Sequence, residues 1–161
     1  WSTGYWRGIE MEIGLANLDD ADLRDLLTLH QRRMVESSPP GTSFALDLSG
    51  LAHPDVSVFA ARHDGSLVGV AALKQIEPRS GEIKSMRVVD RELGTGVGFA
   101  LLSHLIGVAR DRGYRTLMLE TGTGEGFAAA NALYLRNGFV RRGPFADYAA
   151  SDFNIFYERA L

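Results

Sequence analysis

The stretch 91-RELGTGVGFALL-102 holds the residues with the clearest chemical potential, because Gly94, Gly96 and Gly98 stand at alternate positions directly before an expected helix. Glycine costs backbone entropy at such a place, so a bare backbone suggests close approach by another group. The first N–H groups of a helix have no partners within it, and the helix dipole favours negative charge at that end. The spacing therefore indicates an anion-binding site, with a simple glycine-rich turn as the alternative.

The sequence lacks the other common site motifs. A dinucleotide fingerprint would need glycine where Phe99 stands, and no G-K-[ST] follows to complete a P-loop. Neither H-E-x-x-H nor G-x-S-x-G occurs. The absence of cysteine excludes disulfides, thiolate zinc sites and a cysteine nucleophile. The four histidines are scattered, so we expect them to be surface or core residues and expect no bound metal: His30, His53, His63 and His104.

The apolar patterns predict an α/β fold that places the glycines between a strand and a helix. A strand over 11–16 leads to a helix capped by Asp19 and Asp20, which must end before 37-SSPPG-41. The step 63-HDGS-66 between two apolar runs predicts a β-hairpin. The order of the expected strands and helices along the chain predicts a sheet whose first strands are largely antiparallel. The remaining expected elements are a strand over 82–89, a helix closed by 110-RDRG-113, a strand over 115–121, a helix over 126–136, and strands over 139–142 and 153–159.

Length and composition describe one ordinary globular domain. The chain has 161 residues, of which 45% are hydrophobic and 23% are charged, and its formal net charge is −3. That charge argues against a nucleic-acid partner, which usually meets a basic surface, and no apolar run approaches the ~20 residues of a membrane span. We therefore expect a cytoplasmic protein without nucleic-acid or membrane partners. Residues 11–161 would form the domain, and residues 1–10 a peripheral arm or an artificial remnant.

Two motifs on these elements carry a resemblance to a known family. The first is the glycine motif, which fits two overlapping patterns: residues 91–96 have the form [QR]-x-x-G-x-[GA], and residues 88–98 have the form V-x(5)-G-x-G-x-G. The second lies at residues 133–139, which have the form L-Y-x-x-x-G-F. Together they resemble the GNAT superfamily of acetyl-CoA-dependent N-acetyltransferases over nearly the whole chain. Four further pieces resemble a small, poorly defined bacterial subgroup: 38-SPP-40, 81-GEIKSM-86, 119-LETG-122 and 143-GPFADY-148.

The resemblance implies a mixed α/β (α+β) fold with a largely antiparallel central sheet and helices on both faces. Two parallel strands, here 82–89 and 116–121, would splay into a V that holds the pantetheine arm of acetyl-CoA. The backbone of Met86 and Val88 would pair with that arm. Leu93 replaces the arginine of many relatives, so the grip on the coenzyme pyrophosphate would come from the backbone. The N–H groups involved would be those of Leu93, Gly94, Thr95, Gly96, Val97 and Gly98.

The resemblance also implies direct attack of a primary amine on acetyl-CoA in a ternary complex. Tyr134 matches the general acid of the family, although on an amphipathic helix it could equally be a core aromatic. Glu82 matches the glutamate that some relatives use as general base, and Glu120 is a second candidate that also lines the acceptor site. Glu82 could instead be a solvated strand-end carboxylate, and a water chain could carry the proton in place of either residue. A backbone N–H near Met86 or Arg87 would bind the oxyanion.

Selectivity for the acceptor would come from the first helix, the loop after it and the late segment. An aromatic and apolar lining with a few hydroxyls suggests a small amine or an amino acid. Two alternatives stay open, a protein Lys or N-terminal acetyltransferase and a non-catalytic acyl-CoA-binding module, and so does a homodimer. The expected acceptor-binding residues are His30, Met34, Ser37, Ser38, Phe44, Leu46, Glu120, Tyr148 and Asn154.

Overall fold

The computed structural model describes residues 1–6, 9–41, 43 and 46–161. Within this part of the chain, eight strands form one sheet. The strands are β1 (Ser2–Trp6), β2 (Ile9–Leu15), β3 (Val56–His63), β4 (Ser66–Glu77), β5 (Ser80–Val88), β6 (Thr116–Gly122), β7 (Val140–Arg142) and β8 (Asn154–Ala160). The α-helices are α1 (Ala21–Glu36), α2 (Leu48–Leu51), α3 (Val97–Asp111) and α4 (Ala128–Arg136), and two 3-10 turns, Asp90–Glu92 and Glu125–Phe127, precede α3 and α4.

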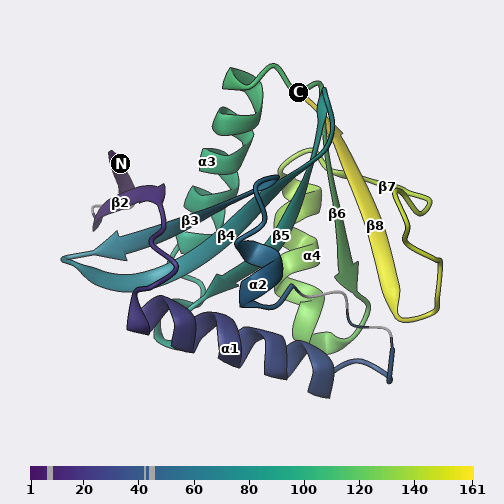
Figure 1. The fold of residues 1–161 in the computed structure, drawn as a ribbon, viewed down its shortest axis with the longest axis horizontal. Coiled ribbons are helices and arrows are strands. Elements are labelled where there is room, and N and C mark those ends of the chain that lie inside the picture. The colour runs from purple at the N-terminus through teal and green to yellow at the C-terminus, as the bar shows by residue number, and fades with distance from the viewer. Residues whose placement is uncertain (7–8, 42, 44–45) are drawn as a thin grey trace.

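The sheet has the order β1-β2-β3-β4-β5-β6-β8-β7, and all its neighbours are antiparallel except β5 and β6. The parallel pairing is short, because only 80–83 lies beside 116–119 while β5 continues to Val88. Figure 1 shows the two strands diverging beyond the paired section. The expected fold class, a mixed and largely antiparallel sheet with a splay between two parallel strands, is confirmed.

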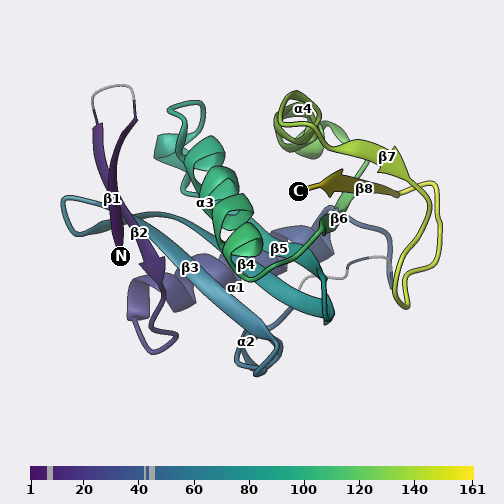
Figure 2. The same cartoon turned by 90° about the horizontal axis from the view of Figure 1, so that it is seen from above.

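Helices cover both faces of the sheet, with α3 and α4 on one side and α1 and α2 on the other (Figure 2). The helix α1 buries leucines spaced three and four residues apart, as one face of a helix requires. Burial of each such leucine contributes about 1.5–3 kcal/mol. The α1 leucines are Leu23, Leu26 and Leu27, packed near Val58, Ala60 and Val70, and on the other face Leu101, Leu102 and Leu105 of α3 pack near Leu73 and Leu117.

The hairpin predicted from 63-HDGS-66 is present between β3 and β4. Asp64 and Gly65 both adopt positive φ, 48° and 76°. A two-residue turn with positive φ at both positions matches the right-handed twist of paired strands, which explains the Asp-Gly step. The closing glycine of the expected 110-RDRG-113 helix end is also confirmed, since Gly113 has a φ of 76° just after α3.

Three features of the amino-terminal part differ from the sequence-based expectation. The strand expected over 11–16 begins earlier, at Ile9, and the residues before it include the edge strand β1, antiparallel to β2. Backbone pairing with β2 gives this stretch its strand structure. The segment before β3 contains the short helix α2, whose start is capped by the Asp47 carboxylate accepting from the Gly50 N–H at 2.8 Å. Phe44 lies outside the described residues.

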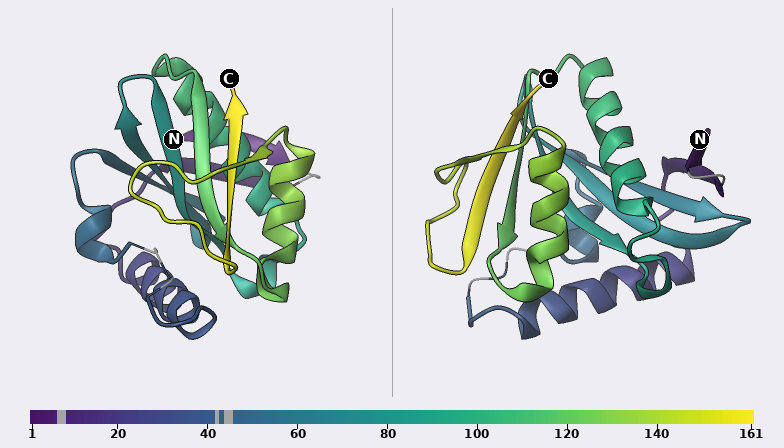
Figure 3. Two further views of the ribbon diagram at one scale, coloured as in Figure 1. Left: turned by 90° about the vertical axis from the view of Figure 1, so that its right-hand side faces the viewer. Right: turned by 180° about the vertical axis from the view of Figure 1, so that it is seen from behind.

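The carboxyl ends of β5 and β6 meet the amino ends of two helices at one edge of the molecule. Figures 1 and 3 show the first turns of α3 and α4 at the same end of the molecule as α1, which lies across this edge. Ligands of open α/β sheets bind beyond the carboxyl ends of parallel strands. The fold therefore brings the glycine stretch, the splay and α1 to the same place. Among the described residues, no helix has the length and apolar character needed to cross a bilayer.

Candidate active site

Two cavities meet at the open end of the splay. One has a volume of 620 Å³ and is lined by β5, the glycine stretch, the start of α3 and one side of α4. The other has a volume of 360 Å³ and is lined by α1, β5, the end of β6 and α4. We call them the glycine-side cavity and the α1-side cavity. They share the lining residues Met86, Arg87, Gly126 and Ala130, so two molecules could touch there.

The glycine stretch has a backbone that requires glycine. Gly94 has a φ of 77°, and Gly96, the residue that caps α3, has a φ of 102°. Such angles strain residues that carry a Cβ. The N–H groups of Leu93 and Thr95 donate to the carbonyls of Asp90 and Glu92 at 3.3 Å each, so these two turn bonds occupy part of the expected cradle. Among the described residues, no backbone acceptor pairs with the N–H groups of Gly94, Gly96, Val97 and Gly98, so these donors are left for an anion.

A β-bulge in β5 sets which side chains face which cavity. Lys84 pairs with Ala72 and Arg87 pairs with Val70, so two residues of β5 oppose the single residue Ala71. Ser85 takes a φ of 53° within this bulge. Because the bulge adds one residue, Lys84 and Arg87 lie on the same face of the sheet although their numbers differ by three.

The bulge also determines which face of the sheet each of the next residues of β5 points to. Met86 and Val88 pack into the core cluster beneath α3, on the side of the glycine-side cavity. Arg87 stands opposite Val70, which belongs to the core cluster beneath α1. The two expected contacts of the pantetheine arm, Met86 and Val88, therefore line the glycine-side cavity.

Glu82 is held in a buried cluster with Lys84 and Tyr148. Only 3% of Glu82 is exposed. The Tyr148 hydroxyl donates a short hydrogen bond to Glu82 Oε1, and Lys84 Nζ lies 3.3 Å from the same oxygen and 2.6 Å from the Tyr148 oxygen. Burial and the adjacent Glu82 charge raise the pKa of Tyr148, so the phenol stays protonated. Glu82 thus lines the α1-side cavity as a carboxylate that is already paired.

Glu120 lines the same cavity without such partners. It follows the last β6 residue that pairs with β5, and among the described residues nothing donates a hydrogen bond to its carboxylate. Burial raises its pKa to about 7, the Lys84 charge opposes that shift, and the Glu82 charge adds to it. A carboxyl with this pKa can take up a proton near neutral pH, as a general base requires.

Tyr134 lines the α1-side cavity from α4. Its ring packs edge-on against Phe139, with centroids 5.8 Å apart, and lies 6.1 Å from the ring of Tyr157. Within the described chain its hydroxyl has no hydrogen-bond partner, although only 6% of the residue is exposed. Burial raises its pKa, with smaller contributions from Glu120 and Tyr157, so it remains a proton donor at neutral pH. Tyr134 is thus both a core aromatic and a cavity residue.

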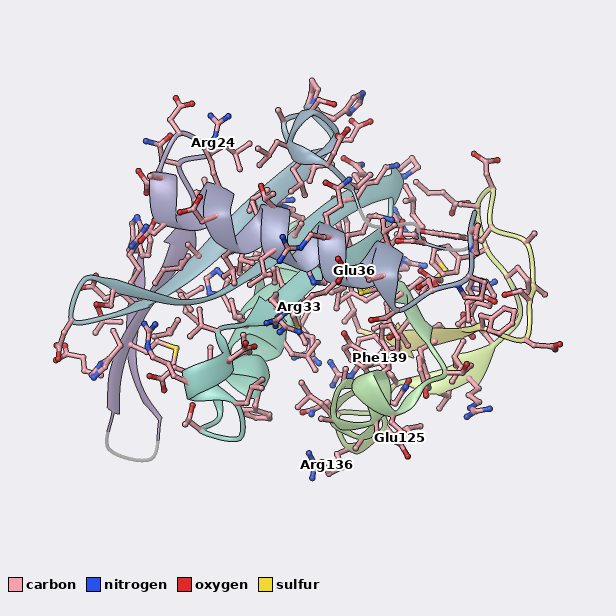
Figure 4. All side chains as sticks on the ribbon, turned by 90° about the horizontal axis from the view of Figure 1, so that it is seen from below. Arg24, Arg33, Glu36, Glu125, Arg136 and Phe139 are labelled. Atoms are coloured by element: carbon pink, nitrogen blue, oxygen red, sulfur yellow. The ribbon has the colours of Figure 1, made fainter. Side chains whose placement is uncertain are left out.

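Two arginines that sequence reasoning missed complete the α1-side cavity. Arg33 of α1 donates from both terminal nitrogens to Asp90, each at 2.9 Å, and Arg87 donates to the same carboxylate at 2.7 Å. Figure 4 shows Arg33 on the side of α1 that faces α3 and α4. Arg33 could have been found from its helical spacing to His30 and Met34. Lys84 was likewise missed, two residues after Glu82 on the same strand.

The expected acceptor-binding residues divide into two groups. His30, Met34, Ser37 and Glu120 line the α1-side cavity, whereas four others line neither cavity: Ser38, Leu46, Tyr148 and Asn154. Burial lowers the pKa of His30 to about 4, and the Arg87 charge adds to this, so the imidazole is neutral. Among the described residues no group of three His, Cys, Asp or Glu side chains could hold a metal ion.

Comparison with known proteins gives matches over most of the chain. Residues 23–139 match the model of the acetyltransferase (GNAT) family. The chain is 40% identical over 136 residues to the uncharacterized N-acetyltransferase YedL of Escherichia coli (strain K12), which covers 84% of this chain and 86% of that protein. It is 37% identical over 131 residues to the IAA acetyltransferase of Azospirillum brasilense, covering 81% and 84%. A crystal structure from Klebsiella pneumoniae, assigned to the acyl-CoA N-acyltransferases, superposes with a TM-score of 0.74 at 31% identity, over 94% of this chain and 97% of that one.

Proposed function

The chain belongs to the acetyltransferase (GNAT) family and is an acetyl-CoA-dependent N-acetyltransferase, and on this premise we propose that it acetylates the primary amine of a small molecule or amino acid. The observation that carries the proposal is the meeting of two cavities at the splay of β5 and β6. Acetyl-CoA occupies the glycine-side cavity, and the amine occupies the α1-side cavity. The two substrates therefore come together from opposite faces of the sheet.

The glycine stretch holds the pyrophosphate of the coenzyme. The N–H groups of Gly94, Gly96, Val97 and Gly98 supply hydrogen bonds, and the helix dipole adds favourable charge. The pantetheine arm runs past Met86 and Val88 along the unpaired part of β5. This brings the thioester to the junction of the two cavities.

The neutral amine nitrogen attacks the thioester carbonyl. Glu120 accepts one N–H proton from this nitrogen, directly or through a water, and the carbon–sulfur bond breaks to leave the acetamide and the coenzyme A thiolate. A backbone N–H at the bulge, near Met86 or Arg87, stabilises the oxyanion. Tyr134 donates its hydroxyl proton to the departing thiolate, since burial keeps the phenol protonated. Each proton that leaves the amine or reaches the sulfur thus has a named side chain.

Glu82, the other candidate base, acts as a positioning residue. Its carboxylate already accepts from Tyr148 and lies beside Lys84, so abstraction of a proton would disrupt a buried cluster. Its negative charge helps to raise the pKa of Glu120. Glu82 therefore supports the base rather than serving as one.

The test is release of free thiol from acetyl-CoA in the presence of amines, amino acids and short peptides. Mass spectrometry of the acceptor should find one added acetyl group on nitrogen. Peptides should be poor acceptors, because a cavity of 360 Å³ beneath α1 suits a small molecule. Efficient acetylation of peptides alone would favour a protein acetyltransferase. Tight acetyl-CoA binding without thiol release on any acceptor would favour a binding module and overturn the proposal.

A further inference from the structure

The transfer of an acetyl group leaves Arg87 without a task for its side chain, yet Arg87 lies at the centre of the site. It lines both cavities at their junction. It reaches the α1 face because of the bulge, since a regular strand would turn it away from the face that holds Lys84. A strained φ of 53° at Ser85 accompanies this bulge. The fold therefore places a guanidinium beside the acceptor by an uncommon backbone arrangement.

Arg87 shares its carboxylate partner with Arg33. Among the described residues, Asp90 hydrogen-bonds to both guanidinium groups, and the Glu36 charge acts more weakly on Arg33, so Asp90 is the one carboxylate paired directly with the two arginines. Arg87 is 25% exposed in its side chain, and its Nε is buried with no hydrogen-bond partner among the described residues. Buried donors normally have a partner, so the protein leaves the hydrogen-bonding capacity of the Arg87 guanidinium partly unused. The Arg87 charge also reaches the cavity wall, where it contributes to the low pKa of His30.

The other end of the same cavity has the opposite character. Glu82, in the parallel section of β5 and β6, and Glu120, just beyond it, line this end, with Lys84 as the one neighbouring cation among the described lining residues. A cationic ammonium group is favoured beside these carboxylates, and an anionic group is favoured beside the arginines. The two ends together fit a molecule that carries both charges.

We propose that the acceptor carries a carboxylate in addition to its reacting amine, as an amino acid does, and that Arg87 binds this carboxylate. Arg33 contributes positive charge from α1, and the amine faces Glu120. An arginine suits the task, because its planar guanidinium forms charge-assisted hydrogen bonds with a carboxylate. The inference rests on the proposed function and narrows its acceptor class.

The experiment compares amino acids with their carboxamides as acceptors in the thiol-release assay. The two molecules share the amine and the side chain and differ in the anionic group. The carboxamide has the less basic amine, so more of it is unprotonated at neutral pH. This difference alone would make the carboxamide the better acceptor, so it cannot produce a preference for the amino acid. We expect kcat/KM to favour the amino acid over its carboxamide by roughly 10- to 100-fold, the range of a hydrogen bond to a charged group.

Four variants test whether that preference comes from Arg87. Arg87→Gln should bring the preference close to one while acetyl-CoA affinity, measured by calorimetry, stays as in the parent. Asp90→Asn removes the ion pair of Arg87 without changing Arg87 itself, so it should preserve the preference. Arg136→Gln changes a cation of the glycine-side cavity only and should also preserve it. Arg87→Lys keeps the charge and should recover part of the preference.

Each contrary outcome has a distinct meaning. Equal use of amino acids and carboxamides by the parent enzyme would overturn the inference and leave the proposed function intact. Loss of the preference in Asp90→Asn would show that Arg87 acts only as part of an ion-pair network. A loss of acetyl-CoA affinity in Arg87→Gln would assign Arg87 to the coenzyme. No thiol release with any amine would instead overturn the proposed function.

Discussion

Replacing the neighbours of Glu120 should move the pH dependence of acetyl transfer in opposite directions. The pKa of Glu120 is raised to about 7, chiefly by burial, while Lys84 lowers it and Glu82 raises it. Glu82→Gln removes the raising charge, so the acidic limb of the rate profile should move to lower pH. Lys84→Met removes the lowering charge, so the limb should move to higher pH. The Lys84 effect should be the larger of the two, because Lys84 has the greater influence on Glu120.

The size of the effect follows from the fraction of Glu120 that is ionised. With a pKa of about 7, Glu120 is ionised in half of the molecules at pH 7. Below pH 6 the ionised fraction falls about tenfold for each pH unit. Ionisation of Glu120 should therefore account for an about tenfold drop of the parent rate between pH 6 and pH 5, whereas in Glu82→Gln this contribution should begin at a lower pH. Glu120→Gln should lose this contribution, keep only that of amine protonation, and be slower by roughly 10²–10⁴-fold at pH 7.5.

The assay is thiol release from acetyl-CoA with both substrates saturating, from pH 5 to pH 8.5, because kcat then reports groups in the bound complex. Protonation of the amine itself contributes the same limb to every variant, so differences between variants isolate Glu120. Circular dichroism at each pH excludes unfolding as a cause. A limb that stays at one pH in the parent, Glu82→Gln and Lys84→Met would refute the assignment of Glu120 as the base.

Three further predictions concern the proton donor Tyr134, the glycine Gly96 and the effect of Glu120 on stability. Tyr134→Phe should leave acetyl-CoA affinity and the packing of the ring unchanged but slow turnover, and a parent-like kcat would exclude Tyr134 as the proton donor. Gly96→Val should abolish acetyl-CoA binding in calorimetry, because φ is 102° there and a side chain would enter the phosphate space. Gly65→Val, at a φ of 76° in the β3–β4 turn, introduces similar strain away from both cavities and should bind normally. Glu120→Gln should raise Tm at pH 8 and leave it unchanged near pH 4. The raised pKa of Glu120 means that its ionisation destabilises the folded protein as pH rises through 7. Below about 4.5 the carboxyl is protonated in both the folded and the unfolded state, so the substitution has no such effect there.

The fold was predictable because its elements have clear periods and clear ends. The leucines of α1, the Asp-Gly turn and the glycines before α3 each indicate one local structure with a physical reason. The splay between β5 and β6 came from the resemblance to a family, since no local pattern indicates where two parallel strands separate. The edge strand β1 was missed because 1-WSTGYWRGIE-10 fits no strong pattern.

The site was predictable only in part, because two of its features depend on distant pairing. A bulge at Ser85 decides the face of Arg87, and a serine with positive φ gives no signal in sequence. Tyr148 lies 66 residues from Glu82, and only the folded sheet brings the two together. The motif residues Gly94, Gly96 and Tyr134, by contrast, were named from local sequence patterns, and each lines one of the two cavities.

The division of the site between the two faces of the sheet has a consequence for how such a protein can diversify. Helix α1 supplies His30, Arg33 and Met34 to the α1-side cavity and nothing to the glycine-side cavity. With the amine in the α1-side cavity as proposed, a duplicated gene could change His30 and Met34 and acquire a new acceptor while keeping its coenzyme site. Arg33 is the exception on this helix, because it hydrogen-bonds to Asp90 in the turn before the glycines. A protein engineer could therefore vary His30 and Met34 to change acceptor choice while leaving the coenzyme site unchanged.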